Sequence, residues 1–114
     1  MKKVTVVLQK SPLNTLRNSE ALRMSLGLTL ANNAVRVIFV QDALYSLLNT
    51  LPERIKSPGF RRHIEMLDKL KCRLVAERES MEERGIKEIN YPLEIKDRGE
   101  VFTLIKESDS LIVY

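Results

Sequence analysis

Residues 70–85 read Leu-Lys-Cys-Arg-Leu-Val-Ala-Glu-Arg-Glu-Ser-Met-Glu-Glu-Arg-Gly and predict a strand that leads directly into a helix. Residues 72–76 form a short, mostly apolar run, long enough for one buried strand. The residues that follow are polar and favour helix, and the closing glycine is typical of a helix end. Ligands of an open parallel sheet bind at the carboxyl ends of its strands. Any chemistry here is therefore expected near Glu77 and Arg78, whereas Cys72, the only cysteine, lies at the opposite end of the predicted strand.

The size and composition of the chain predict a single globular domain spanning residues 1–114. Of the 114 residues, 44% are hydrophobic and 30% are charged. One cysteine excludes an internal disulfide and any zinc site built from several cysteines. The apolar run 4–8 is too short for the core of a signal peptide, and no stretch has the roughly 20 apolar residues that cross a bilayer. These features predict a cytoplasmic protein with no membrane attachment.

Apolar strands alternate with helical segments along the chain. Strands are expected at 3–8, 35–40, 72–76 and 110–114, and residues 87–93 are expected to form either a short edge strand or a loop. Helices are expected over 16–31, 43–49, 60–71, 77–84 and 100–107. Two strands joined by a helix make a parallel pair with a right-handed crossover. The sequence therefore predicts an α/β fold, a three-layer sandwich around a mostly parallel sheet of about five strands.

Polar side chains follow the first three predicted strands. Because the carboxyl ends of parallel strands share one edge of the sheet, these side chains are expected to converge there. They are Lys10, Ser11 and Asn14 after the first strand, Gln41 and Asp42 after the second, and Glu77, Arg78 and Ser80 after the third. The pattern predicts a polar cleft and leaves its substrate open.

The sequence holds no pattern for a metal site, a phosphate-binding loop or a serine hydrolase. The four glycines lie too far apart for a dinucleotide fingerprint or a P-loop. His63 is the only histidine, and it is predicted to lie mid-helix beside an apolar stripe in a structural or surface role. The glutamates of residues 77–83 are expected to solvate a short helix and to favour its amino end. We predict no metal and no cofactor.

Cys72 is the one candidate nucleophile. A reactive thiolate needs a pKa that is lowered by nearby cations or by a helix amino terminus. Lys71 and Arg73 are neighbours in sequence, but in a strand their side chains point to the opposite face. A cysteine entering a central strand is usually a small buried hydrophobe. A structural and a reactive role for Cys72 both stay open at this point.

The net charge of +4 is unevenly distributed. Residues 53–73 hold seven Lys and Arg against three Asp and Glu, whereas residues 77–114 hold six basic against ten acidic residues. A basic middle is suited to RNA or to an acidic protein, so the 54–73 segment is a candidate binding surface. The simpler interpretation is a solvated helix face.

Four segments together resemble a known family. They are the first strand with the following Lys10-Ser-Pro and the helix that opens near 17–21, then Val37-Ile-Phe-Val-Gln-Asp-Ala-Leu-Tyr-Ser-Leu-Leu, Arg73 to Gly85, and Ser108-Asp-Ser-Leu-Ile-Val-Tyr. In order and spacing they resemble the DsrE/DsrF-like sulfur-relay family, most closely its TusC/DsrF branch. The resemblance covers nearly the whole chain.

The resemblance implies a flavodoxin-like sheet, assembly into homo- or hetero-oligomers, and persulfide transfer between partner proteins for tRNA thiolation or sulfur oxidation. In the DsrE-type branch the acceptor cysteine lies just past the third strand. Counting back from Arg84-Gly85 puts that place at Glu77 here. The DsrF-type branch also lacks a firm cysteine there and is thought to be a companion subunit. The resemblance therefore implies a non-catalytic relay subunit with an indirect link to tRNA, and the alternative is a sulfurtransferase that uses Cys72 as persulfide acceptor.

Overall fold

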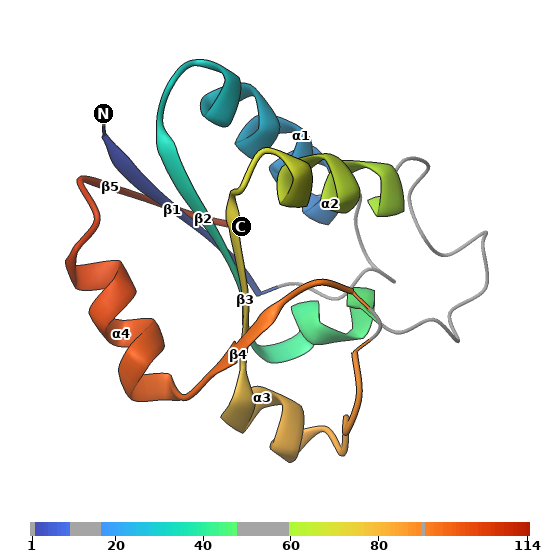
Figure 1. The fold of residues 1–114 in the computed structure, drawn as a ribbon. Coiled ribbons are helices and arrows are strands. Elements are labelled where there is room, and N and C mark those ends of the chain that lie inside the picture. The colour runs from blue at the N-terminus through green and yellow to red at the C-terminus, as the bar shows by residue number, and fades with distance from the viewer. Residues whose placement is uncertain (1, 10–16, 48–59, 90) are drawn as a thin grey trace.

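The computed structural model describes residues 2–9, 17–47, 60–89 and 91–114. Its strands form one five-stranded, all-parallel sheet in the order β4-β3-β2-β1-β5 (Figure 1). The strands are β1 (Lys3–Leu8), β2 (Ala34–Phe39), β3 (Arg73–Glu77), β4 (Glu94–Lys96) and β5 (Ser110–Val113). The helices are α1 (Arg17–Leu30), the 3₁₀ helix η1 (Gln41–Leu47), α2 (Phe60–Lys69), α3 (Arg78–Glu83) and α4 (Arg98–Lys106). The predicted α/β sandwich is confirmed.

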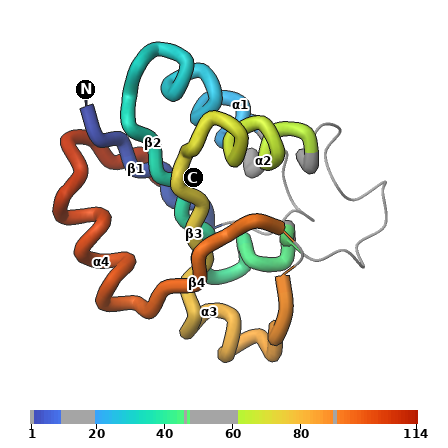
Figure 2. Tube along the Cα trace, viewed as in Figure 1, coloured from blue at the N-terminus to red at the C-terminus, as the bar shows by residue number. Residues whose placement is uncertain are grey.

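The helices divide between the two faces of the sheet. Figure 2 shows α1 and α2 together on one side, and α4 alone on the other. Under α4 lies a small cluster of buried side chains: Val7, Ile38, Val75, Val101 and Leu104. The short η1 and α3 follow β2 and β3 at the carboxyl edge of the sheet. This edge is therefore bounded by three helical segments, η1, α3 and the start of α4.

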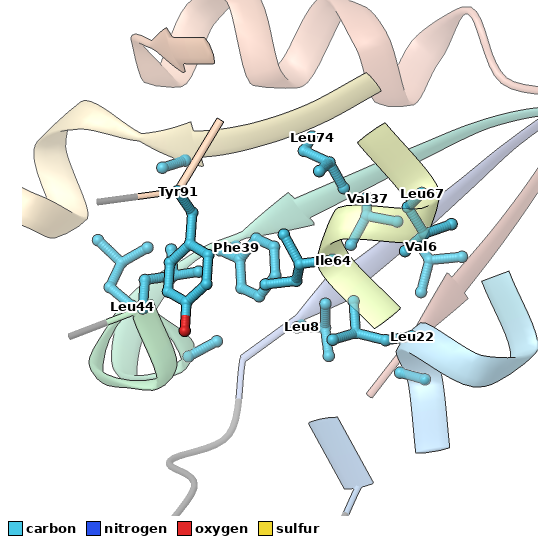
Figure 3. Packing of buried hydrophobic residues seen from close by; sticks show 14 of the residues in the cluster. Val6, Leu8, Leu22, Val37, Phe39, Leu44, Ile64, Leu67, Leu74 and Tyr91 are labelled. Carbon is cyan, nitrogen blue, oxygen red and sulfur yellow. The ribbon is translucent and has the colours of Figure 1, made fainter. Parts of the chain in front are cut away.

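The main core lies between the sheet and the pair α1 and α2 (Figure 3). Alternate residues of β1 and β2 point to this face, because side chains of a strand alternate in direction. The fully buried members that Figure 3 labels are Val6, Leu8, Leu22, Val37, Phe39, Leu44, Ile64 and Leu67. Burying each such side chain stabilises the fold by roughly 1.5–3 kcal/mol. This core fixes the strands whose carboxyl ends carry the polar residues.

Several element boundaries differ from the sequence prediction. The third strand begins at Arg73, so Cys72 precedes it and does not open it. In the described part of residues 87–93 there is no strand, and the edge strand is Glu94–Lys96. Pro92 has no backbone N–H for a ladder, which disfavours strand before that point. The last helix begins at Arg98, earlier than predicted, because the side chain of Asp97 accepts from the backbone N–H of Glu100 at 2.8 Å and caps it.

The segment after β2 is a 3₁₀ helix over Gln41–Leu47, where the sequence predicted a helix over 43–49. Residues 48 and 49 lie outside the described part of the chain. Gln41 has a φ of 51°, in the left-handed region, so the chain turns sharply as it leaves β2. This early turn brings the Gln41 backbone to the carboxyl edge of β3.

The partly buried side chain of His63 makes stability sensitive to mild acid. Its Nδ1 has no hydrogen-bond partner in the described part of the chain, and burial, together with the charges of Arg23 and Arg62, lowers its pKa from 6.5. The unfolded chain thus binds this proton more readily, and the free energy of unfolding falls as pH drops through about 6.5. We expect His63→Gln to flatten this decline in urea titrations between about pH 7.5 and 5.5. A decline that the variant keeps in full would contradict the assignment.

Candidate functional site

Glu77 lies buried at the exit of β3, with 6% of the residue exposed. Its Oε1 accepts hydrogen bonds from Ser80 Oγ at 2.6 Å and from Arg98 Nη2 at 2.9 Å and Nε at 3.3 Å. The Ser80 hydroxyl in turn accepts from the backbone N–H of Gln41 at 2.9 Å. A buried carboxylate is tolerated only when such donors replace water. The network therefore holds together the ends of β2 and β3 and the start of α4.

Arg98 joins three carboxylates of this edge. Its Nη2 also lies 3.0 Å from Oε1 of Glu83, and its backbone N–H donates to the Glu79 carboxylate at 2.8 and 3.0 Å. Hydrogen bonds to Glu77 and then to Glu83 raise the pKa of Arg98, so the guanidinium stays charged. Its side chain is 59% exposed, and water therefore screens much of this attraction. The role of Arg98 is mainly to satisfy the buried carboxylate.

A cleft of about 450 Å³ lies along this network. That volume is within the range of small-ligand sites. One wall is polar and is formed by Gln41, Glu77, Ser80, Glu83 and Arg98. The other is apolar and is formed by Val7, Val40, Val101, Phe102 and Ile105. The cleft is thus amphipathic, with charge on the α3 side and aliphatic and aromatic surface toward α4.

The structure brings three of the predicted cleft residues together and places two others elsewhere. Gln41, Glu77 and Ser80 line the cleft. The side chain of Arg78 is exposed and lies 3.7 Å from both Glu82 and Asp97. Asp42 is exposed too, and its Oδ1 lies 3.0 Å from Arg84. Lys10, Ser11 and Asn14 fall outside the described residues.

Arg98, Glu83 and the apolar wall were not expected from the sequence. Arg98 follows β4, and the amino end of a helix after a parallel strand lies at the same carboxyl edge as the other strand exits. To place Arg98 at this edge from the sequence, β4 must first be located at Glu94–Lys96. The sequence instead left residues 87–93 undecided between an edge strand and a loop. Three residues of the apolar wall, Val101, Phe102 and Ile105, come from α4, where Phe102 is 60% exposed.

Cys72 lies at the opposite edge of the sheet, five residues from Glu77 and therefore roughly 16 Å away along the strand. It is 9% exposed, and its thiol donates to the carbonyl oxygen of Val35 at 3.1 Å. It lines a separate cavity of about 420 Å³ that also has Lys71 and Arg73 in its walls. Burial nevertheless raises the pKa of the thiol to about 12. At neutral pH the group is therefore a protonated hydrogen-bond donor.

Among residues 2–9, 17–47, 60–89 and 91–114, no group of three or more His, Cys, Asp or Glu side chains is placed to hold a metal ion. None of the helices in those ranges has the length and apolar character of a bilayer span. The amphipathic cleft at the carboxyl edge is thus the best-defined candidate site of the described chain.

An all-parallel five-stranded sheet, with helices on both faces and a polar site at the strand exits, defines a flavodoxin-like α/β protein. The profile of the DsrE/DsrF-like family matches residues 2–114, and the chain belongs to this family. No curated protein matches the sequence.

Among the solved structures that share the fold are two bacterial proteins. The first is the ychN protein from E. coli, with a TM-score of 0.86 and 18% identity, over 100% of both chains. The second is a conserved protein of unknown function from Bacteroides thetaiotaomicron, with a TM-score of 0.73, 13% identity, and coverage of 99% of this chain and 95% of the other. At such identities the likeness supports the fold alone.

Proposed function

We propose that this chain is a non-catalytic subunit of a cytoplasmic sulfur-relay complex of the TusC/DsrF type. The observation that carries the proposal is Glu77. Its carboxylate, held by Ser80 and Arg98, occupies the exit of β3, where the DsrE-type branch is expected to carry its acceptor cysteine. A carboxylate has no sulfur to bond to sulfane sulfur, so this site supports transfer only through a partner.

Membership of the DsrE/DsrF-like family supports a sulfur-relay role, since the family resemblance implies work in protein complexes. The partner is either another relay protein or a second copy of this chain. Any connection to tRNA thiolation would then be indirect, because it passes through the subunit that carries the persulfide.

A second candidate function is that of a sulfurtransferase with Cys72 as the acceptor. It is favoured by the cavity beside Cys72, whose walls include Lys71 and Arg73. It is disfavoured by the pKa of about 12, at which roughly one thiol in 10⁴–10⁵ is ionised near neutral pH. The thiolate is the attacking species, so the protein would have to move Cys72 into a more polar setting before transfer.

Persulfide loading separates the two functions. The protein is incubated with a cysteine desulfurase and cysteine, and its intact mass is measured beside that of Cys72→Ser, in which the hydroxyl can still donate to Val35 O. We expect neither protein to gain a sulfur atom, because Cys72 is buried and protonated. Stable, stoichiometric gain of one sulfur that Cys72→Ser abolishes would overturn the proposal in favour of the sulfurtransferase.

The third alternative, an RNA- or protein-binding module, depends on the basic 54–73 segment. Residues 54–59 lie outside the described part of the chain. Within the rest, Arg62, Lys69 and Lys71 are exposed, whereas Arg73 is engaged with Glu94 at 2.9 Å. Phosphate contacts make binding strongly salt-dependent, so tight tRNA binding that falls steeply with salt would favour this alternative.

A further inference from the structure

The hydrogen-bond network around the buried Glu77 carboxylate uses one of its two oxygens. Within the described residues, three hydrogen bonds reach the Glu77 carboxylate, from Ser80 and from Arg98, and each of them ends on Oε1. Among the residues that the structure describes, no donor contacts Oε2. Glu77 lines the cleft with 7% of its side chain exposed, and within the described chain Oε2 is the carboxylate oxygen that the network leaves for a ligand.

The charge of the cleft is complementary to a cation. Among the described residues, its lining holds two carboxylates, Glu77 and Glu83, against the guanidinium of Arg98. Just outside the lining, Glu79 adds a third carboxylate, and Lys106, whose Nζ lies 5.5 Å from the centroid of the Phe102 ring, adds a second cation, so one negative charge remains in excess. An anionic ligand such as an RNA phosphate would meet this excess of negative charge, and so is disfavoured. A buried carboxylate oxygen without a donor is most stabilised by a charged N–H group.

The opposite wall selects a ligand with an apolar stem. Val40, Phe102 and Ile105 form aliphatic and aromatic surface that faces the same space as Glu77. Phe102 is 60% exposed, so its ring surface is available to a ligand in the cleft. A long side chain that ends in a cation buries its methylene groups on such a wall while its head reaches the carboxylate.

We propose that the cleft binds a lysine side chain from a partner protein, with its ammonium group donating to Oε2 of Glu77 and its methylene stem against Phe102 and Ile105. Lysine fits better than arginine, because a guanidinium fork needs both carboxylate oxygens and Oε1 is already occupied. The inference deepens the proposed function and rests on it for the identity of the partner as a relay protein. The chemistry of the cleft is independent of sulfur.

The test is an NMR titration of the isotope-labelled full chain with Nα-acetyl-lysine N-methylamide. We expect weak, saturable binding, with a Kd on the order of millimolar, that shifts the amide signals of Gln41, Ser80 and Phe102. The norleucine derivative has the same stem without the ammonium group, and we expect it to bind roughly ten-fold more weakly. The arginine derivative should also bind more weakly than lysine. Equal or tighter binding of either analogue would overturn the proposal.

Matched variants locate the binding. Glu77→Gln should weaken binding of the lysine derivative about ten-fold, while Glu82→Gln, on the α3 helix that follows Glu77 and with a 69% exposed side chain, should leave it unchanged. Because Glu77→Gln alters a buried network, Phe102→Ala gives a second measurement: it removes exposed surface, and is expected to weaken binding severalfold. Leu30→Ala, at a 70% exposed position on α1, serves as its control.

Two results would place the lysine elsewhere and overturn the inference. The first is that neither Glu77→Gln nor Phe102→Ala weakens binding, and the second is that Glu82→Gln weakens binding as much as Glu77→Gln does. These titrations use neither sulfur nor a partner. If the titrations contradict the lysine proposal, the proposed function still stands. If Cys72 takes up persulfide sulfur, the proposed non-catalytic function is overturned, but the titration result is unaffected.

Discussion

Glu77→Cys, made in a Cys72→Ser background, is expected to convert a chain that takes up no sulfane sulfur into one that takes up close to one sulfur atom per chain. The substitution puts a thiol at the exit of β3, facing the cleft. The groups that now stabilise the Glu77 carboxylate, the Arg98 guanidinium and the Ser80 hydroxyl, would then favour a thiolate and lower its pKa. On this argument, the one group that the natural site lacks for sulfur uptake is a thiol.

The transfer balances without an added oxidant. The introduced thiolate attacks the outer sulfur of the donor persulfide, an S–S bond forms between them, and the donor cysteine leaves as a thiolate. The measurement is the intact mass after incubation with cysteine desulfurase and cysteine, followed over time. The gain should be one sulfur atom and should be reversed by a reducing thiol.

Two further variants test why the sulfur is accepted. Glu82→Cys in the same background places an exposed thiol on α3 outside the cleft, and we expect its loading to be at least about ten-fold slower. Adding Arg98→Gln to Glu77→Cys removes the cation and should slow loading by a similar factor, because the thiolate fraction falls. Equal rates for Glu77→Cys and Glu82→Cys would show that the cleft contributes nothing beyond exposure.

The hydrophobic pattern was sufficient to predict four of the five strands but not their order in the sheet. The apolar runs of β1, β2 and β3 are buried on both faces, as in a parallel sheet, and a βαβ unit could be predicted from them. The pairing of β5 with β1 depends on long-range contacts, and no local pattern encodes it. The edge strand β4 has only three residues, two of them charged, so its apolar signal is too weak to locate it.

The candidate site, like the sheet, could be predicted only in part. Gln41, Glu77 and Ser80 could be placed at one edge because each follows a recognisable strand. Arg98 could not be placed at this edge from the sequence, since its position depends on that of β4. The role of Cys72 could not be decided from the sequence, which left a buried structural role and a reactive role both open. The pKa of its thiol is raised by burial, and its contact with Val35 of β2 is visible only in the packed structure.

The cleft is built on a rigid part of the molecule. Phe39 ends β2, one residue before Val40 and two before Gln41, both of which line the cleft. Its ring lies in the main core, between Leu8 and Ile64 on one side and Leu44 and Tyr91 on the other (Figure 3). The packing of this one side chain therefore links the stability of the sheet to the geometry of its carboxyl edge.

Phe39→Ala is expected to lower the free energy of unfolding by about 3–5 kcal/mol, because it removes a fully buried ring from a central strand and leaves a cavity. The free energy of unfolding of a domain of this size is typically about 5–15 kcal/mol, so much of the variant is expected to unfold at modest urea concentrations. The measurement is a urea titration followed by circular dichroism. Phe102→Ala is the matched control, and since its ring is 60% exposed we expect a change within about 0.5 kcal/mol. A loss below about 1 kcal/mol for Phe39→Ala would show that the core between the sheet, η1 and α2 repacks around the missing ring, and that the cleft does not depend on it.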